Sequence, residues 1–160
     1  MKLILAYNSK QRQDLLDMLG MQYEIKVSNE PEKSNSKDPN QYVIDLSKIK
    51  ANSVASHLNK SALIIAADSI IYMDGHILEK PKTKQEAFEN MQKMKGKTTY
   101  AVTGVTIKDL YKNKELSFAD TCEVSFKKDI VDEDIWWYVN NEEHVLERAG
   151  YSVAGKTSFL

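Results

Sequence analysis

Hydrophobic and polar positions follow two different periods along the chain, and together they predict both strands and helices. Apolar or alternating runs predict strands at residues 2–6, 23–28, 62–73, 76–80, 98–107 and 115–126. Apolar residues spaced three or four apart predict helices at residues 10–19, 39–58 and 84–95, and a short helix that begins near residue 132. Because these elements do not follow a regular βαβ order, the pattern predicts a mixed-sheet α/β or α+β domain that covers residues 1–160.

Turn and capping residues mark several ends of these segments. Asp74 and Gly75 are typical of a tight hairpin turn between two strands. Thr83 and Glu86 have the spacing of a capping box at the start of a helix. Asp132 is the predicted N-cap of the last helix, whose apolar and aromatic side chains are expected in the core or in a dimer contact rather than in a base-stacking platform.

The overall charge and composition argue against several classes of function. A formal net charge of −1 over 160 residues disfavours a general binder of nucleic acids or membrane surfaces. No apolar run approaches the ~20 residues of a membrane span, and the apolar part of the N-terminal segment is too short for a secretory signal. The single cysteine, Cys122, cannot form an internal disulfide and is expected as a buried or half-buried thiol in a strand. We therefore expect a cytoplasmic protein.

The first predicted strand leads directly into a helix, and that junction is a candidate anion site. Ser9 is the predicted N-cap, so backbone N–H groups at the start of the helix would point out of the turn. Lys10 and Arg12 add positive charge at the same place. An ordinary capped helix with solvated basic side chains would have the same sequence, and the segment alone does not decide between the two.

Two charged residues lie where the pattern predicts a core. Lys50 lies on or beside the apolar stripe of the second predicted helix, where a lysine either binds a partner or extends along the core edge. Asp68 lies at the end of an apolar strand, and burial of an unpaired carboxylate there costs several kcal/mol. Asp68 must therefore pair with a cation, take up a proton or hold a metal ion. Since ligand sites in open α/β sheets gather at strand ends, we favour a functional role over structural pairing.

A third residue, Lys80, completes a set of charges that would suit a polyphosphate. Lys80 follows the predicted hairpin and is expected at the same end of the sheet as Asp68. The candidate ligands are oxygen atoms, and the sequence contains no cluster of Cys and His, so Mg²⁺ or Mn²⁺ is expected rather than zinc. Because no G-x-S-x-G or other nucleophile motif is present, direct attack by water is the expected chemistry.

The C-terminal segment matches a nucleotide-binding pattern by its letters alone. Gly150, Gly155, Lys156 and Thr157 satisfy G-x-x-x-x-G-K-[ST]. A P-loop requires a helix after the glycine turn, and three residues follow Thr157 in this sequence. The match is therefore expected to be accidental.

Several segments, in one order along the chain, match the motifs of a known family. LAYNSKQRQDLL is similar to L-A-S-x-S-P-R-R-x-x-L-L, LSKIKA to L-A-x-x-K-A, and AADS to a strand that ends in A-D-T. Further along, EKP, TGV, TCEVSF and AGYSVAG are similar to G-K-P, T-G-V, T-x-V-x-F and A-G-x-Y-x-I-Q-G. Together these segments, within residues 3–160, resemble the Maf family of nucleotide pyrophosphatases, first described as septum-formation inhibitors.

This resemblance implies a fold and an activity. The fold would be an elongated, mixed α/β structure akin to the inosine-triphosphate pyrophosphatases, often found as a homodimer. The activity would be metal-dependent hydrolysis of a nucleoside triphosphate to the monophosphate and pyrophosphate, a house-cleaning reaction of nucleotide metabolism. The resemblance also implies a single Maf-like domain that ends before the family's last strand and helix.

The motif matches imply roles for individual residues. Those expected to bind the phosphates are Ser9, Arg12, Lys50 and Lys80. Asp68 would accept a proton from the attacking water, and together with Glu32 it would hold Mg²⁺ or Mn²⁺. Glu30 lies two residues before Glu32 in the same loop and is the alternative to it.

Three positions depart from the family motifs where the resemblance places base selection. Gln11 replaces an arginine, Ser69 a threonine and Ala154 a glutamine. Alanine cannot make the paired hydrogen bonds of a glutamine amide, so the nucleobase is left open. Pyrimidine triphosphates such as dTTP and UTP are expected, with a modified or methylated nucleotide as the alternative.

Two other functions are compatible with the same residues. One is a nucleotide-binding regulator of septation and cell division without turnover. The other is a purine-directed pyrophosphatase of the inosine-triphosphate type. Pyrophosphate release from a panel of nucleotides distinguishes all three.

Overall fold

The structure is a computed structural model, and it describes residues 2–58, 61–147 and 151. The strands in this part of the chain are β1 (Lys2–Leu5), β2 (Glu24–Ile25), β3 (Ala62–Met73), β4 (His76–Leu78), β5 (Thr98–Asp109) and β6 (Lys114–Ser125). The helices are α1 (Lys10–Met18), α2 (Pro39–Ser56), α3 (Lys84–Met94) and α4 (Asp132–Asn141). None of these helices is long and apolar enough to span a bilayer.

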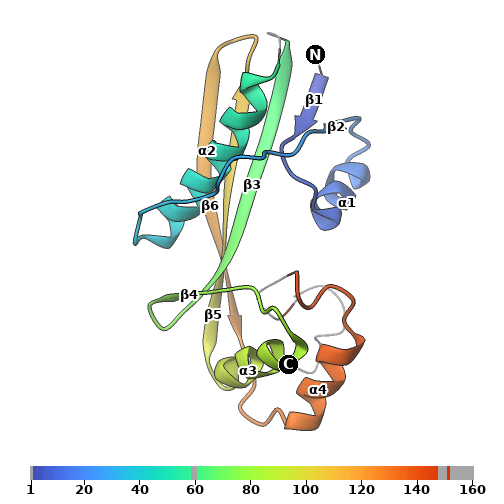
Figure 1. The fold of residues 1–160 in the computed structure, drawn as a ribbon, viewed down its shortest axis with the longest axis vertical. Coiled ribbons are helices and arrows are strands. Elements are labelled where there is room, and N and C mark those ends of the chain that lie inside the picture. Colours follow the sequence, from blue (N-terminus) through green and yellow to red (C-terminus); the bar gives the residue numbers. More distant parts are fainter. Residues whose placement is uncertain (1, 59–60, 148–150, 152–160) are drawn as a thin grey trace. The chain divides into compact units, whose positions relative to one another are not determined.

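The described strands form one mixed sheet (Figure 1). Their order is β2-β1-β3-β5-β6, and β4 pairs with β3 outside this path. β1 pairs in parallel with β2 and with β3, whereas β4 pairs antiparallel with β3. The predicted mixed-sheet α/β class is therefore confirmed.

Several predicted boundaries are confirmed by the backbone. β3 has the predicted bounds, and the turn that follows it places both Asp74 (φ 51°) and Gly75 (φ 83°) in the left-handed region, as a two-residue hairpin loop requires. Asp38 caps α2 by accepting a hydrogen bond from the Gln41 backbone N–H at 2.7 Å. Thr83 caps α3 in the same way through the backbone N–H of Glu86.

The chain divides into two compact units. The first unit comprises residues 1–69 and 102–120, and the second comprises residues 70–101 and 121–160. The second unit has a core in which α3 and α4 pack together, and the ring of Phe88 stacks on that of Trp136 with centroids 4.4 Å apart. These aromatic residues therefore contribute to packing, as expected for the last helix.

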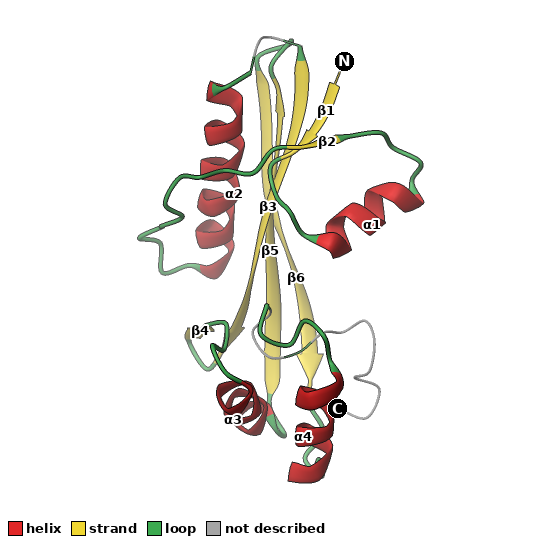
Figure 2. Cartoon of the chain, turned by 45° about the vertical axis from the view of Figure 1, so that its right-hand side comes forward, coloured by secondary structure: helices red, strands yellow, loops and turns green. Residues whose placement is uncertain are grey.

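In the first unit, helices cover both faces of the sheet, and Figure 2 shows α2 and α1 on opposite sides of β3. Successive side chains of a strand point to opposite faces, so each strand supplies two cores. On the α2 face the buried cluster contains Ile4, Ala6, Ile64 and Ala66, together with Ala51 and Val54 of α2. On the α1 face it contains Leu5, Tyr7 and Ala67, with Leu16 and Tyr23 packed against them.

Three local predictions are wrong, two of them because the segments lie at an edge. The predicted strand at residues 23–28 is reduced to the two exposed residues of β2, which is at the edge of the sheet and, among the described strands, pairs only with β1. Cys122 is exposed rather than buried, because β6 forms the other edge of the sheet path and most of its side chains face solvent. The N-cap of α4 is Val131, so Asp132 is the first residue of the helix, where its charge favours the positive end of the helix dipole.

Candidate functional site

The alternation of β3 presents two neighbouring polar residues to opposite faces of the sheet. Ile64 and Ala66 face α2, so Asp68 continues the same row and meets α2. Ile65 and Ala67 face α1, so Ser69 continues that row and meets Arg12 of α1. The prediction that Asp68 lies at the end of its strand is wrong, because β3 continues to Met73. The middle of β3 therefore brings together polar groups from both helices, all within the first unit.

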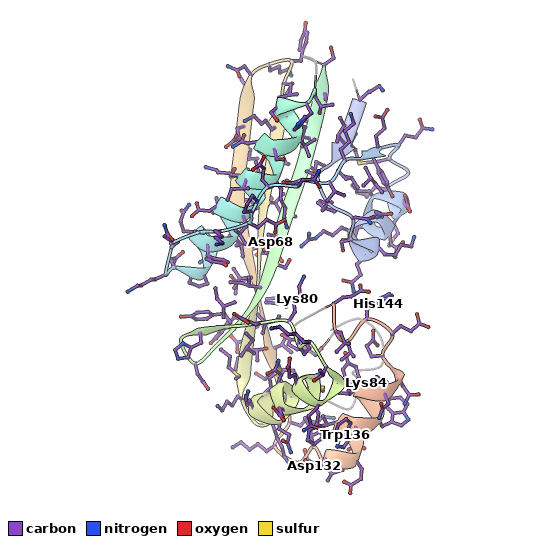
Figure 3. The ribbon with its side chains drawn as sticks, viewed as in Figure 1. Asp68, Lys80, Lys84, Asp132, Trp136 and His144 are labelled. Atoms are coloured by element: carbon purple, nitrogen blue, oxygen red, sulfur yellow. The ribbon has the colours of Figure 1, made fainter. Side chains whose placement is uncertain are left out.

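On the α2 face, Lys50 binds two carboxylates and forms with them what we name the lysine–carboxylate cluster (Lys50, Asp68 and Glu32). The Lys50 ammonium lies 2.5 Å from an Asp68 oxygen and 3.0 Å from a Glu32 oxygen. The side chains of Lys50 and Asp68 are only 12% and 17% exposed, so solvent screens their interaction less than it would a surface ion pair. Figure 3 shows Asp68 on β3 beside the α2 helix. The expectation that Lys50 and Asp68 each need a partner is confirmed.

The loop before α2 carries Glu32 to this cluster. The Ser34 hydroxyl donates to one Asp45 oxygen at 2.6 Å, and the Gln41 side-chain amide donates to the other at 2.7 Å. Both hydrogen bonds lower the pKa of the Asp45 carboxyl, and the bond from Ser34 ties the loop to α2. Of the two loop acids considered, Glu32 contacts Lys50, whereas the recorded contact of Glu30 is from its backbone N–H to the Ser28 hydroxyl.

On the α1 face, Arg12 is bound to the middle of β3 rather than solvated. One terminal nitrogen donates to the Ala67 carbonyl at 2.9 Å, and the other donates to the Ser69 hydroxyl at 2.8 Å. The guanidinium carbon lies 5.0 Å from the centre of the Tyr7 ring. Burial lowers the pKa of Arg12, and the nearby Asp68 and Tyr7 partly oppose that shift.

The remaining predicted residues behave differently from Arg12. Ser9 is the N-cap of α1 by position, with an extended backbone (φ −99°, ψ 117°), and its side chain makes no capping hydrogen bond. Lys10 is a solvated side chain that pairs with Asp14 one turn later, at 2.7 Å. Gln11 is exposed at the start of α1. Of the two basic residues in the first turn, Arg12 therefore reaches β3 and Lys10 does not.

Two predicted residues are not part of this arrangement as described. Lys80 is exposed and belongs to the second unit, so its approach to Asp68 stays a prediction (labelled in Figure 3). Ala154 lies outside the described residues, as do the glycines, lysine and threonine of the P-loop-like segment.

Ser69, by contrast, forms a link between strands. Its hydroxyl, which accepts from Arg12, lies 2.7 Å from the Thr103 hydroxyl of β5. Thr103 belongs to the TGV segment, and the next residue, Gly104, lies against the backbone of α2: a Cβ at that position would lie 2.3 Å from the Val43 carbonyl carbon. The close approach of α2 to β5 keeps Lys50 within reach of β3.

The oxygen ligands of the cluster suit a hard divalent cation. Asp68 and Glu32 both contact the ammonium group of Lys50, so the two carboxylates lie close enough together to bind one cation. No group of three or more His, Cys, Asp or Glu side chains that could hold a metal occurs among the described residues. Two carboxylates completed by water and phosphate oxygens are the donor set that Mg²⁺ favours in phosphate chemistry.

Sequence reasoning missed Tyr7, Asp45 and Thr103. Each acts through a partner from a different element, and no local pattern marks it. Tyr7 had one available signal, since an aromatic residue stands where the motif L-A-S-x-S-P-R-R has its serine. That substitution places a ring directly beside a half-buried arginine.

Solved structures share this fold. A HAM1 protein from Coxiella burnetii superposes with a TM-score of 0.53 and 13% sequence identity, covering 81% of this chain and 74% of that one. The Ham1 protein of Staphylococcus aureus superposes with a TM-score of 0.58 at 13% identity, covering 80% of this chain and 73% of that one. At this level of identity the likeness defines the fold class, that of the Ham1 proteins.

The chain itself belongs to the Maf family, because the family described as Maf-like protein matches residues 2–160. A dTTP/UTP pyrophosphatase from Thermoanaerobacter sp. (strain X514) is 37% identical over 155 residues, covering 97% of this chain and 81% of the relative. A dTTP/UTP pyrophosphatase from Caldanaerobacter subterraneus subsp. tengcongensis is 32% identical over 160 residues, covering 100% of this chain and 77% of the relative. The resemblance inferred from the motifs is confirmed.

Proposed function

We propose that this protein is a nucleoside triphosphate pyrophosphatase that converts its substrate to the nucleoside monophosphate and pyrophosphate. The observation that carries the proposal is the arrangement of Lys50 between Asp68 and Glu32, with Arg12 bound to the same part of β3. Relatives that carry the name dTTP/UTP pyrophosphatase at 31–37% identity support the same activity. A regulator that binds nucleotide without turnover is not favoured by these relatives.

The chemistry that these side chains support is hydrolysis by water. The water oxygen forms a bond to the α-phosphorus, the bond between that phosphorus and the α–β bridging oxygen breaks, and pyrophosphate leaves. Asp68 accepts the proton that the water loses. Lys50 and Arg12 neutralise negative charge on the phosphates as the transition state forms, and Lys80 is proposed to assist them. Ser9 would bind phosphate through its hydroxyl, which no capping bond occupies in the described structure.

A divalent cation, Mg²⁺ or Mn²⁺, is proposed as the cofactor, with Asp68 and Glu32 as its protein ligands. When bound, such an ion neutralises phosphate charge and lowers the pKa of a coordinated water. Lys50 contacts both carboxylates, so it would hold them in place while their other oxygen lone pairs bind the ion. Metal dependence is tested by activity after chelation and after titration with each cation.

The base is proposed to be a pyrimidine, as in dTTP or UTP, with a modified nucleotide as the alternative. The proposal rests on the printed activity of the relatives. Gln11, Ser69 and Ala154 differ from the family motifs at the positions linked with base selection. Ser69 already bonds with Arg12 and Thr103, so its hydroxyl has limited capacity to contact a base directly. This is the observation that favours testing modified bases alongside dTTP and UTP.

Pyrophosphate release from a panel of canonical and modified nucleotides, with Mg²⁺ or Mn²⁺, tests the proposal. We expect turnover of at least one triphosphate and its loss in Asp68→Asn. The matched control is Asp74→Asn, since Asp74 also pairs with a lysine (Lys97, at 2.6 Å) but lies in an exposed turn. Binding of nucleotides without turnover would instead support the regulator, and a purine-only profile would support the inosine-triphosphate type.

Assembly and location complete the proposal. A homodimer is proposed from the family resemblance, and analytical ultracentrifugation tests it. A cytoplasmic location and the lack of a nucleic-acid partner stay predictions from composition and charge. Fractionation of cells and binding assays with DNA and RNA check them.

A further inference from the structure

Tyr7 has no role in the proposed mechanism, although its ring contacts Arg12, which has one. It is the second residue after β1, in the loop that leads to α1, and it is only 8% exposed. Its cluster contains Leu5 and Ala67, so the ring packs on the α1 face of the sheet. An aromatic ring at this place is therefore part of the surface on which Arg12 lies.

The Arg12 guanidinium is held by two hydrogen bonds and one contact with an aromatic ring. The Ala67 carbonyl and the Ser69 hydroxyl accept hydrogen bonds from its two terminal nitrogens at 2.9 and 2.8 Å. The Tyr7 ring centre lies 5.0 Å from its central carbon, within the ~6 Å over which a cation interacts favourably with an aromatic face. These two hydrogen bonds use two of the five N–H donors of an arginine, which leaves capacity for phosphate oxygens.

Arg12 requires such support because its position is costly. Burial disfavours the charged form of its side chain and lowers its pKa. The face of an aromatic ring offsets that cost without supplying an acceptor atom, whereas a carboxylate would compete with phosphate for the same donors. A ring therefore holds the cation in place and leaves its charge available to an anionic ligand.

We propose that Tyr7 is a positioning residue of the triphosphate site, in which its ring face holds the Arg12 guanidinium against the middle of β3 for contact with phosphate. This inference rests on the proposed function, since it assigns Arg12 to phosphate binding. The ring is a departure from the matching motif, which has serine where this sequence has Tyr7. The aromatic face of Tyr7, rather than its hydroxyl group, holds the Arg12 guanidinium in place.

Two substitutions separate the ring face from the hydroxyl and from the apolar volume. Tyr7→Phe keeps the face, and we expect nucleotide KM and kcat within about twofold of wild type. Tyr7→Leu keeps an apolar side chain without a face, and we expect KM to rise about fivefold to thirtyfold with a smaller change in kcat. Should Tyr7→Leu fail to fold, Tyr7→Met replaces it, since its flexible side chain fills irregular space. The matched control is Tyr23→Leu, which removes a ring from the same cluster without touching Arg12.

A double-mutant cycle distinguishes positioning from packing. In an Arg12→Gln background, Tyr7→Leu should change KM less than twofold, because the cation that the ring holds is gone. Since Tyr7 is buried, Tyr7→Leu is expected to lower the melting temperature in either case. A merely structural role would leave KM unchanged or give the same KM effect with and without Arg12, and either result overturns the inference.

Calorimetric binding of inorganic tripolyphosphate provides a readout that does not need turnover. We expect Tyr7→Leu to weaken this binding by the same fivefold to thirtyfold, roughly the range of a cation–aromatic contact, and Tyr7→Phe to leave it unchanged. If wild type hydrolyses no nucleotide but shows this pattern, the proposed function fails and the positioning role stands. If wild type hydrolyses nucleotides but the Tyr7 variants bind tripolyphosphate equally, only the positioning role fails. If wild type does neither, both fail.

Discussion

Lys50 shows how a single residue can link the interior of the protein to its proposed chemistry. Its ammonium contacts Asp68 on β3 and Glu32 in the loop before α2, and only 12% of its side chain is exposed. A buried carboxylate that loses its cation is strongly destabilising, by about 3–5 kcal/mol in comparable cases. Lys50 is therefore expected to support stability as well as the proposed phosphate binding, and a substitution there should affect both.

We predict that Lys50→Ala lowers kcat/KM at least tenfold, about 1.4 kcal/mol or more of transition-state stabilisation, and lowers the melting temperature. The physical reason is the loss of positive charge beside the phosphates and beside Asp68. Steady-state kinetics and thermal unfolding measure the two effects. Lys48→Ala is the control, because Lys48 lies on the same helix and its pair with Glu115 is longer, at 3.8 Å, and more exposed. Equal effects of the two substitutions would contradict this role of Lys50.

At the scale of elements, the position of α2 on the sheet depends on one glycine. Gly104 of β5 lies so close to the first half of α2 that an added Cβ would lie 2.3 Å from the carbonyl carbon and oxygen of Val43. Backbone atoms cannot rotate away as a long side chain could. Further along the same contact, the hydroxyls of Ser47 and Thr106 lie 2.7 Å apart in a fully buried position. The close packing of α2 and β5 thus determines where Lys50 stands relative to Asp68.

We predict that Gly104→Ala destabilises the fold by about 1–3 kcal/mol or more, because α2 must move away from the sheet. It should also lower activity, since Lys50 moves with the helix. Chemical denaturation and nucleotide hydrolysis check the two effects. Gly20→Ala is a suitable comparison: nothing lies within 4 Å of the added Cβ, and its cost arises only from the left-handed backbone at φ +66°. A stable and active Gly104→Ala protein would show that the helix is not held by this contact.

At the scale of the whole molecule, the chain contains two compact units that share three strands. β3, β5 and β6 each have residues in both units, since the boundaries fall at residues 69/70, 101/102 and 120/121. Disruption of such a strand in one unit interrupts the same hydrogen-bonded ladder in the other. The two units should therefore unfold together even though each has its own core.

We predict a single unfolding transition that moves as a whole when the second unit is weakened. Trp136→Leu removes a ring that stacks on Phe88, and we expect a loss of about 1–3 kcal/mol. Hydrogen exchange followed by mass spectrometry compares the wild type with Trp136→Leu. In each protein β1 and α4 should lose protection together, and in the variant this should happen at a lower urea concentration. Early loss of α4 with β1 still protected would mean that the units unfold independently.

The sequence alone was sufficient for the elements with a strong period and clear end signals. The bounds of β3, the caps of α2 and α3 and the turn at Asp74–Gly75 all depend on interactions within a few residues. Edge strands were less predictable, since the short length of β2 and the exposure of the β6 thiol depend on which strands lie beside them, and in the described part of the chain both strands are at an edge of the sheet path. Whether residues 1–160 form one domain stays a prediction.

By itself, the sequence determined that Lys50 and Asp68 stand at apolar positions and need partners, because periodicity and the cost of burying charge are local properties. Only the tertiary structure decided which partners they have. Glu32 rather than Glu30 contacts Lys50, and Arg12 binds Ala67 and Ser69 over the Tyr7 ring. These contacts join segments up to 57 residues apart, as between Arg12 and Ser69. They depend on strand register and on the distance between helix and sheet, which no local pattern encodes.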